Sequence, residues 1–180
     1  MAGGKRLLHV LGSGHCGQWI VVHGHKHHPK LEYAQGSGDS PAILSAGSLC
    51  ACIYSTLQTL ARNEFHIVKV VQEEVERLGL VGRVFSWDWA FGDGWARARA
   101  GSGLPYQCGF GYRVHGKALA SAIAAKVVPG FVDWSELCQQ IPEIEFLVPQ
   151  DMAKLFRHLK RDHRIEVLYV DGAPRQIGRF

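Results

Sequence analysis

The chain has 180 residues, of which 47% are apolar and 20% are charged. These proportions describe an ordinary globular protein that can bury a core, and they exclude a disordered chain. The formal net charge of +4 allows a partner that carries phosphate groups, but it is lower than expected of a dedicated nucleic-acid binder.

No segment of the sequence predicts export or insertion into a membrane. The short apolar stretch after Lys5 and Arg6 is interrupted by His9 and Gly12, which excludes a secretory leader. No stretch approaches the roughly 18 apolar residues that a membrane helix needs. The five cysteines are an odd number without regular spacing, which is typical of reduced thiols. We therefore expect a cytoplasmic protein that does not contact a membrane.

In chain order, the first half of the sequence predicts one helix and then a series of strands. The helix covers residues 4–11, and Gly12, Ser13 and Gly14 end it. The strands are expected where runs rich in β-branched and aromatic residues lie between turn-forming residues. These runs are residues 18–23, 30–34, 41–46, 63–71 and 80–91.

Small and flexible residues interrupt this pattern and predict a linker at residues 99–105. The linker separates a first domain, residues 1–98, from a small α+β extension, residues 106–180. In the extension we expect three helices and then two strands around Asp171 and Gly172, a pair that favours a two-residue hairpin turn. The helices are expected at residues 116–127, 133–141 and 149–162, and the strands at residues 165–170 and 175–180.

Four histidines lie within six consecutive positions, from His23 at the end of the apolar strand to His28 before Pro29. Gly24 gives the backbone freedom at this strand end, so that His25 and His27 can converge on one pocket. Imidazole is a ligand for zinc, manganese and iron, and two imidazoles one residue apart can serve two adjacent metal ions. The alternatives are a solvated polar turn and a tract that binds metal without performing chemistry.

The order of these elements resembles the C-terminal end of the calcineurin-like metallophosphoesterase family. The last metal motif of that family is Gly-His-x-His, and residues 24–27, GHKH, are similar to it. Residues 46–49, AGSL, resemble the Gly-Ser turn that follows this motif in many members. The resemblance covers about residues 4–95. It implies an α/β fold in which this part of the chain is the C-terminal half of an α/β/β/α sandwich.

The same resemblance implies a dinuclear centre of manganese, iron or zinc in which His25 and His27 each ligate one metal ion. The bridging hydroxide of such a centre attacks a phosphoester. In the family, the earlier metal motifs precede Gly-His-x-His by well over a hundred residues. Only 23 residues precede this motif here, and the earlier motifs are missing. No catalytic residue is therefore assigned. Three explanations stay open: a fragment of a longer enzyme, a second chain that completes the metal site, and a relative that has lost the reaction.

An aromatic row begins in the strand predicted at residues 80–91. Trp87, Trp89, Phe91 and Trp95 alternate at strand spacing. Such a row can form a platform on which bases or sugars stack. We favour the packed face of a sheet instead, because tryptophan side chains bury large areas in protein cores.

The extension has the order of elements of a winged-helix module, in which a basic third helix lies in the DNA major groove. Arg157, Lys160, Arg161 and Arg164 would then contact phosphates. One alternative is that these charges form a solvated helix face. Another is a small adaptor domain that binds a protein partner.

The sequence thus predicts an α/β protein that is the C-terminal part of a metal-dependent phosphoester hydrolase, inactive or incomplete on its own. Its substrate would be a phosphoester of unknown class. The alternative is a non-catalytic binding or adaptor protein that acts through residues 106–180 on a protein partner or on a nucleic acid.

Overall fold

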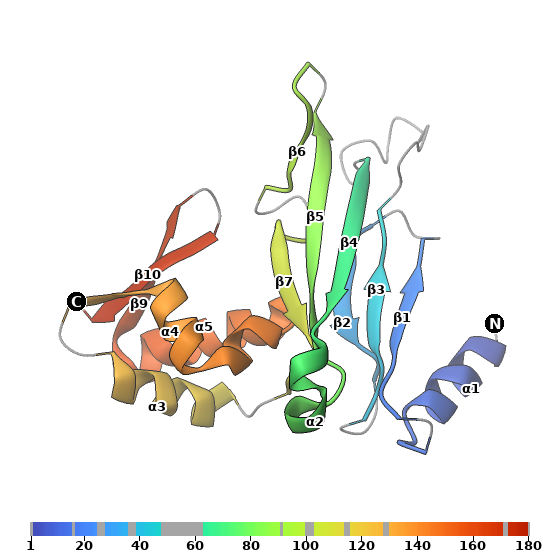
Figure 1. Ribbon diagram of the computed structural model, residues 1–180, viewed down its shortest axis with the longest axis horizontal. Coiled ribbons are helices and arrows are strands. Elements are labelled where there is room, and N and C mark those ends of the chain that lie inside the picture. The colour runs from blue at the N-terminus through green and yellow to red at the C-terminus, as the bar shows by residue number, and fades with distance from the viewer. Residues whose placement is uncertain are drawn as a thin grey trace.

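The computed structural model describes ten stretches of the chain, and the statements below concern these residues. Within them the architecture is mixed α/β, with three sheets and several helices (Figure 1). No helix among them combines the length and the apolar character that a membrane crossing needs. The stretches are residues 2–15, 17–24, 28–35, 39–47, 63–90, 92–99, 103–113, 116–127, 130–170 and 173–179.

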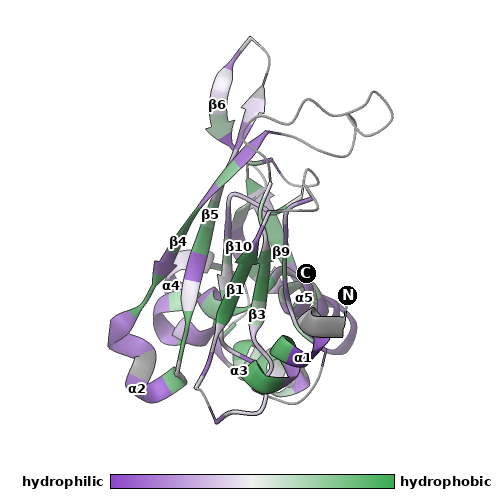
Figure 2. Cartoon of the chain, turned by 90° about the vertical axis from the view of Figure 1, so that its right-hand side faces the viewer, coloured by the Kyte–Doolittle hydropathy of each residue, from purple (hydrophilic) through white to green (hydrophobic). Residues whose placement is uncertain are grey.

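The first sheet is small and follows an N-terminal helix, α1 (Ala2–Leu11). Its strands are β1 (Ile20–His23), β2 (Lys30–Tyr33) and β3 (Ala42–Ser45), in the order β1-β3-β2. β3 pairs parallel with β1 and antiparallel with β2. The β-branched and apolar residues of β1 and β3 favour strands, and both appear largely green, that is hydrophobic, in Figure 2.

The second sheet has one long strand, β5 (Gly82–Ala90), at its centre. β4 (Glu64–Val70) pairs with one edge of β5, and two shorter strands share the other edge. β6 (Gly94–Arg97) pairs with the end of β5, and β7 (Gln107–Phe110) pairs with its beginning. All these pairings are antiparallel. Between β4 and β5 lie a short 3-10 helix, η1 (Gln72–Glu74), and a helical turn, α2 (Val75–Leu78).

The remaining residues form three helices around a three-stranded antiparallel sheet of order β8-β10-β9. The order along the chain is helix, strand, helix, 3-10 helix, helix and hairpin, which is the order of a winged-helix domain. These elements are α3 (Gly116–Lys126), β8 (Phe131–Asp133), α4 (Trp134–Gln140), η2 (Pro142–Phe146), α5 (Pro149–His163), β9 (Ile165–Val170) and β10 (Ala173–Arg179).

Two clusters of buried side chains hold these parts together. One lies between the first two sheets, where Leu44 of β3 and Val84 of β5 pack with Phe110 of β7. The other fills the winged-helix-like part, where Leu155 and Leu159 of α5 are fully buried against α3, α4 and the sheet. Each cluster removes apolar area from water, which is the main favourable contribution to folding.

The predicted fold class is confirmed at its coarser level, a mixed α/β chain that ends in a winged-helix-like part. The α/β/β/α sandwich of a metallophosphoesterase is not confirmed. The division into residues 1–98, 99–105 and 106–180 stays a prediction. Leu104 is nevertheless buried in the first cluster, and β7 belongs to the same sheet as β5.

Candidate nucleic-acid interface

The third helix of the winged-helix-like part, α5, is amphipathic. Pro149 occupies its first turn, where the missing N–H of proline costs nothing. Leu155 and Leu159 point into the core, and the ring of Phe156 packs edge-on against Trp134, with 5.6 Å between the centroids. The buried face therefore fixes the orientation of α5.

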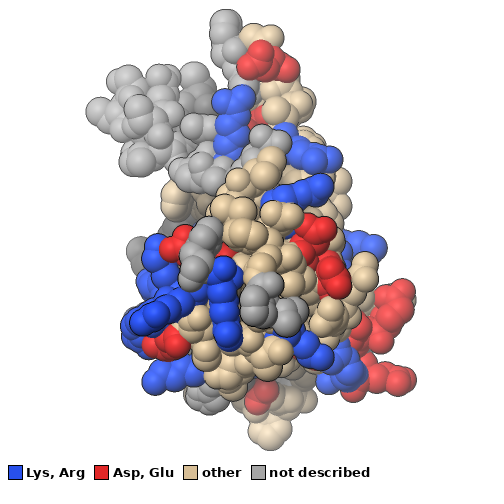
Figure 3. Space-filling model, turned by 90° about the vertical axis from the view of Figure 1, so that its left-hand side faces the viewer, with Lys and Arg blue, Asp and Glu red and all other residues tan. Residues whose placement is uncertain are grey.

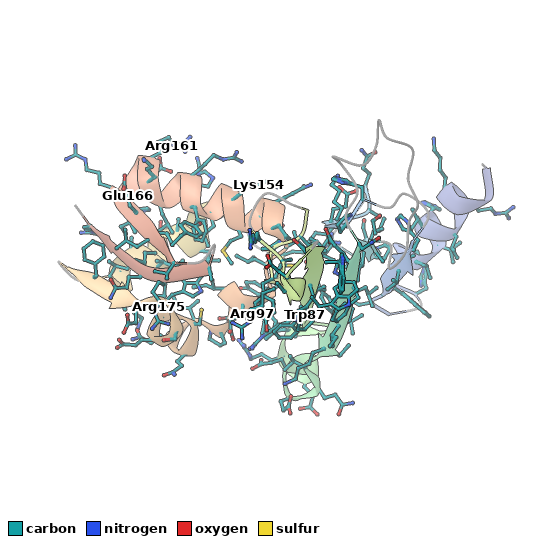
Figure 4. All side chains as sticks on the ribbon, turned by 90° about the horizontal axis from the view of Figure 1, so that it is seen from above. Trp87, Arg97, Lys154, Arg161, Glu166 and Arg175 are labelled. Atoms are coloured by element: carbon teal, nitrogen blue, oxygen red, sulfur yellow. The ribbon has the colours of Figure 1, made fainter. Side chains whose placement is uncertain are left out.

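The opposite face of α5 is a stripe of cations that we call the basic stripe. Its members recur at spacings of three or four residues, so they lie on one side of the helix. Figure 4 shows Lys154 and Arg161 on the same outward side of α5. Figure 3 shows Lys and Arg gathered along one flank of this part of the molecule. The basic stripe consists of Lys154, Arg157, Lys160, Arg161 and Arg164, all exposed.

Three members of the basic stripe form exposed ion pairs. Lys154 Nζ lies 2.7 Å from Asp151 Oδ1, and Lys160 Nζ lies 3.0 Å from Glu166 Oε1. Arg161 Nε lies 2.6 Å from the carboxylate of its neighbour Asp162. Exposed pairs of this kind contribute about 0–1 kcal/mol, so a phosphate group can replace the carboxylate at little cost.

The Arg161 guanidinium, helped by His158, holds the pKa of Asp162 well below its usual range. Asp162 therefore stays ionised at any pH of physiological interest. Asp162 competes with any anion that approaches Arg161, which makes Arg161 the least available cation of the basic stripe.

Arg157 and Arg164 are different. In the parts of the chain that the structure describes, neither guanidinium forms a hydrogen bond or an ion pair. Arg164 also ends α5 in the left-handed conformation, with φ 54°, and its N–H donates to the Leu159 carbonyl. These two arginines are the free charges with which α5 can bind an anion.

A second group of ionisable residues is buried in the first half of the chain. Glu64 and His66 of β4 lie opposite Asp88 and Ser86 of β5, on the face that points to the first sheet. His66 Nδ1 lies 2.9 Å from Ser86 Oγ, and the Gly47 N–H donates to His66 Nε2 over 3.1 Å. Both ring nitrogens are occupied, so His66 is not free to ligate a metal ion. No described group of three or more His, Cys, Asp or Glu side chains has an arrangement that would hold one.

The predicted metal ligands, His25 and His27, lie outside the described residues. A centre of manganese, iron or zinc at these histidines therefore stays a prediction. Phe91 of the aromatic row and the predicted turn at Asp171 and Gly172 also lie outside the described residues.

A cavity of about 270 Å³ lies between the first sheet and α2, and it holds two arginines. Arg77 is paired with Glu74 and with Glu143. Arg113 lies 3.7 Å above the ring of Tyr33 and donates to a backbone carbonyl. Because both cations already have partners within the protein, this cavity is a weaker anion site than the basic stripe.

The favoured interpretation of the aromatic row as a packed face is wrong for its described tryptophans at the β5–β6 end. Trp89 and Trp95 are 45% and 41% exposed, on the face turned away from the first sheet. Sequence reasoning also missed Phe65, Tyr106 and Arg97, which join this face only when the chain folds.

The order and packing of its elements define the class of this part of the chain: a winged-helix-like domain. Residues 108–161 match a family model described as wHTH-Calcineurin_assc, a calcineurin-associated winged helix-turn-helix domain. The match covers fewer than half of the residues of the chain. No curated protein and no solved structure shows a significant match to the chain.

This match corrects the resemblance to calcineurin-like metallophosphoesterases. The matching model describes a winged-helix domain instead of a phosphoesterase domain, and it lies outside residues 4–95. Gly-His-x-His is a four-residue pattern at a strand end, too short to specify an enzyme. Nothing in the described residues or in the comparisons supports phosphoesterase activity.

Proposed function

We propose that the chain is a non-catalytic binding protein whose winged-helix domain binds the backbone of a nucleic-acid duplex through α5. The observation that carries this proposal is the basic stripe on the exposed face of the third helix. A helix of this kind fits the major groove of DNA, and its arginines and lysines neutralise phosphates.

The charges on α5 make this binding moderate. Three carboxylates lie among five cations, so the stripe has only a small excess of positive charge. Arg157 and Arg164 make the first phosphate contacts, and Lys154 and Lys160 exchange their carboxylate partners for phosphate as the duplex docks. The proposed contacts of α5 are to phosphates, which carry no base identity, and we therefore expect binding with little sequence preference.

The test is the fluorescence anisotropy of a labelled duplex of about 20 base pairs, titrated with the full chain between about 50 and 200 mM KCl. Replacing both free arginines, Arg157→Ala with Arg164→Ala, is expected to weaken binding and to lower the salt slope by about 2, roughly one per lost phosphate contact. Lys126→Ala, on α3, is the matched control and should change neither quantity.

A variant with the opposite expected effect sharpens the test. Glu166→Gln removes the partner of Lys160, so it should raise the affinity for the duplex and steepen the salt slope. Absence of salt-sensitive binding at low salt, or an arginine variant that binds like Lys126→Ala, would overturn the proposal. A protein partner would then be the better candidate for the winged-helix domain.

A further inference from the structure

One face of the second sheet packs toward the first sheet, and the other face points away from it. In the described structure, no helix or strand from the first half of the chain covers this second face. Along β5, Val84, Ser86 and Asp88 are buried toward the first sheet. The alternate residues Trp87 and Trp89 point the other way, since side chains alternate between the faces of a strand. The two faces thus differ sharply: small and polar side chains inside, aromatic rings outside.

Strand pairing extends the outer face into a continuous group of rings. Phe65 of β4 lies opposite Trp87, and the two rings stack with centroids 4.8 Å apart. Trp95 of β6 lies opposite Trp89, at 5.4 Å. We call this surface the aromatic face; its rings are Phe65, Phe85, Trp87, Trp89, Trp95 and Tyr106.

The aromatic face is open to solvent at its β5–β6 end. Trp89 and Trp95 are more than two-fifths exposed, and Ile67 beside Phe85 is 52% exposed. A contiguous apolar surface of this kind is uncommon on a monomeric protein and marks a binding site. The opposite end is covered by η2, where Arg83 pairs with Glu145 over 2.5 Å.

The aromatic face carries two exposed cations, Arg97 and Lys69; Glu145 is paired with Arg83, and Asp93 lies in the β5–β6 turn. The Arg97 guanidinium lies 4.5 Å from the centre of the Tyr106 ring, and in the described structure no carboxylate pairs with it. Lys69 is exposed on the same face, opposite Arg83. The carboxylates of Glu64 and Asp88 point to the other side of the sheet. Aromatic rings interleaved with cations suit a ligand that offers both flat bases and phosphates.

We infer that the aromatic face binds single-stranded nucleic acid, with bases stacked on Trp89 and Trp95 and a backbone phosphate at Arg97. Stacking tolerates any sequence because every base has a flat face. A neutral sugar would use the rings equally well, but it would gain nothing from Arg97 and Lys69. The charge therefore favours the nucleic acid.

This site is separate from the duplex site proposed above. Figure 4 shows Trp87 and Arg97 on the side of the molecule away from Lys154 and Arg161. The two surfaces take different ligands, a single strand and a duplex. Each inference can therefore fail without the other.

The experiment titrates the full chain into a labelled oligothymidylate of about 15 nucleotides and follows the anisotropy. Trp89→Ala with Trp95→Ala is expected to weaken binding about ten-fold or more, because stacking of each base is lost. Trp19→Ala is the matched control: Trp19 is 44% exposed but lies beside the first sheet, so its loss should leave the affinity unchanged.

Two further variants keep the test informative. Arg97→Ala, which removes no ring, should lower the salt slope by about 0.7, the value for one phosphate contact of a single strand. A chain with Trp19→Phe and Trp134→Phe retains Trp87, Trp89 and Trp95, and its fluorescence should be quenched on addition of the oligonucleotide. Circular dichroism confirms that each variant is folded.

The outcomes separate the two sites. Arg157→Ala with Arg164→Ala should leave single-strand binding intact; loss of duplex binding alone then concerns only the proposed function. Single-strand binding that is unchanged in Trp89→Ala with Trp95→Ala would overturn this inference. So would quenching by a neutral oligosaccharide in place of the oligonucleotide, or a concentration-dependent dimer that buries these tryptophans.

Discussion

At the scale of single residues, the hydrogen bonds of the buried His66 indicate its protonation state. Because the Gly47 N–H donates to Nε2, the ring proton resides on Nδ1 and is donated to Ser86 Oγ. A second proton would face the Gly47 N–H. Burial lowers the pKa of His66 below its ordinary value of 6.5, and the Asp88 carboxylate opposes this only in part.

His66 therefore makes the protein sensitive to acid. The pKa of His66 is lower in the folded chain than in the unfolded chain, so its contribution to stability is complete above pH 6.5 and is lost as the pH falls through the folded value. We expect the free energy of unfolding in urea to decrease from about pH 7 toward about pH 5. His66→Gln should flatten this profile, whereas His9→Gln, exposed on α1, should not. Equal pH profiles for the two variants would contradict the assignment.

At the scale of elements, Arg164 at the end of α5 has a strained backbone and also belongs to the basic stripe. A residue other than glycine in the left-handed region costs about 1 kcal/mol, and Arg164 adopts it with φ 54°. Glycine would end the helix without that cost, but it would remove a free guanidinium from the basic stripe.

Arg164→Gly is therefore expected to raise the free energy of unfolding by about 0.5–1 kcal/mol and at the same time to weaken duplex binding. Chemical denaturation measures the first effect, and anisotropy measures the second. Arg164→Ala keeps the strain and loses only the charge, so it should weaken binding without the gain in stability. A glycine variant that binds as tightly as the natural chain would show that Arg164 makes no contact.

The elements also show how far the sequence could predict the structure. Apolar periodicity correctly located α1, α3, α4, α5 and the longer strands, because it is a local signal. It missed the short strands β6, β7 and β8. β7 and β8 pair with residues distant in the sequence, whereas β6 forms a hairpin with the end of β5. It also chose the wrong face of β5, since Ser86 and Asp88 are buried while Trp89 is exposed. Which face meets the core depends on the first sheet, which no local pattern encodes.

The predictions of function also depend on whether one local segment carries the feature or distant segments combine to form it. The winged-helix order and Arg157, Lys160, Arg161 and Arg164 were readable from sequence, because the four cations lie on or directly after one amphipathic helix. The ion pair between Lys160 and Glu166 was not, because it joins α5 to β9. A motif as short as GHKH has only four positions, too few to predict a phosphoesterase.

At the scale of the whole molecule, β7 joins the second sheet to the winged-helix domain. The Gly109 N–H donates to the Leu147 carbonyl, and a Cβ at Gly109 would collide with the Glu145 carbonyl and the Phe146 backbone. We call this contact between β7 and residues 145–147 the joint. The close approach at the joint requires glycine, and the joint packs the second sheet against the winged-helix domain.

Gly109→Ala should therefore destabilise the chain by about 1–3 kcal/mol and uncouple its parts. Tryptophan fluorescence reports mainly on the second sheet. In urea, the unfolding transition followed by fluorescence should no longer coincide with the transition followed by circular dichroism. Gly4→Ala is the control, because nothing lies within 4 Å of its added methyl group. Coincident and unshifted transitions in Gly109→Ala would mean that the joint is loose.

The same joint decides what a single break in the backbone would do. Residues 99–105 connect β6 to β7, yet both strands pair with β5. A protease that cut there would leave β7 hydrogen-bonded to β5 and Leu104 near its buried neighbours. The protein would be nicked but not divided, and two polypeptides would continue to behave as one particle.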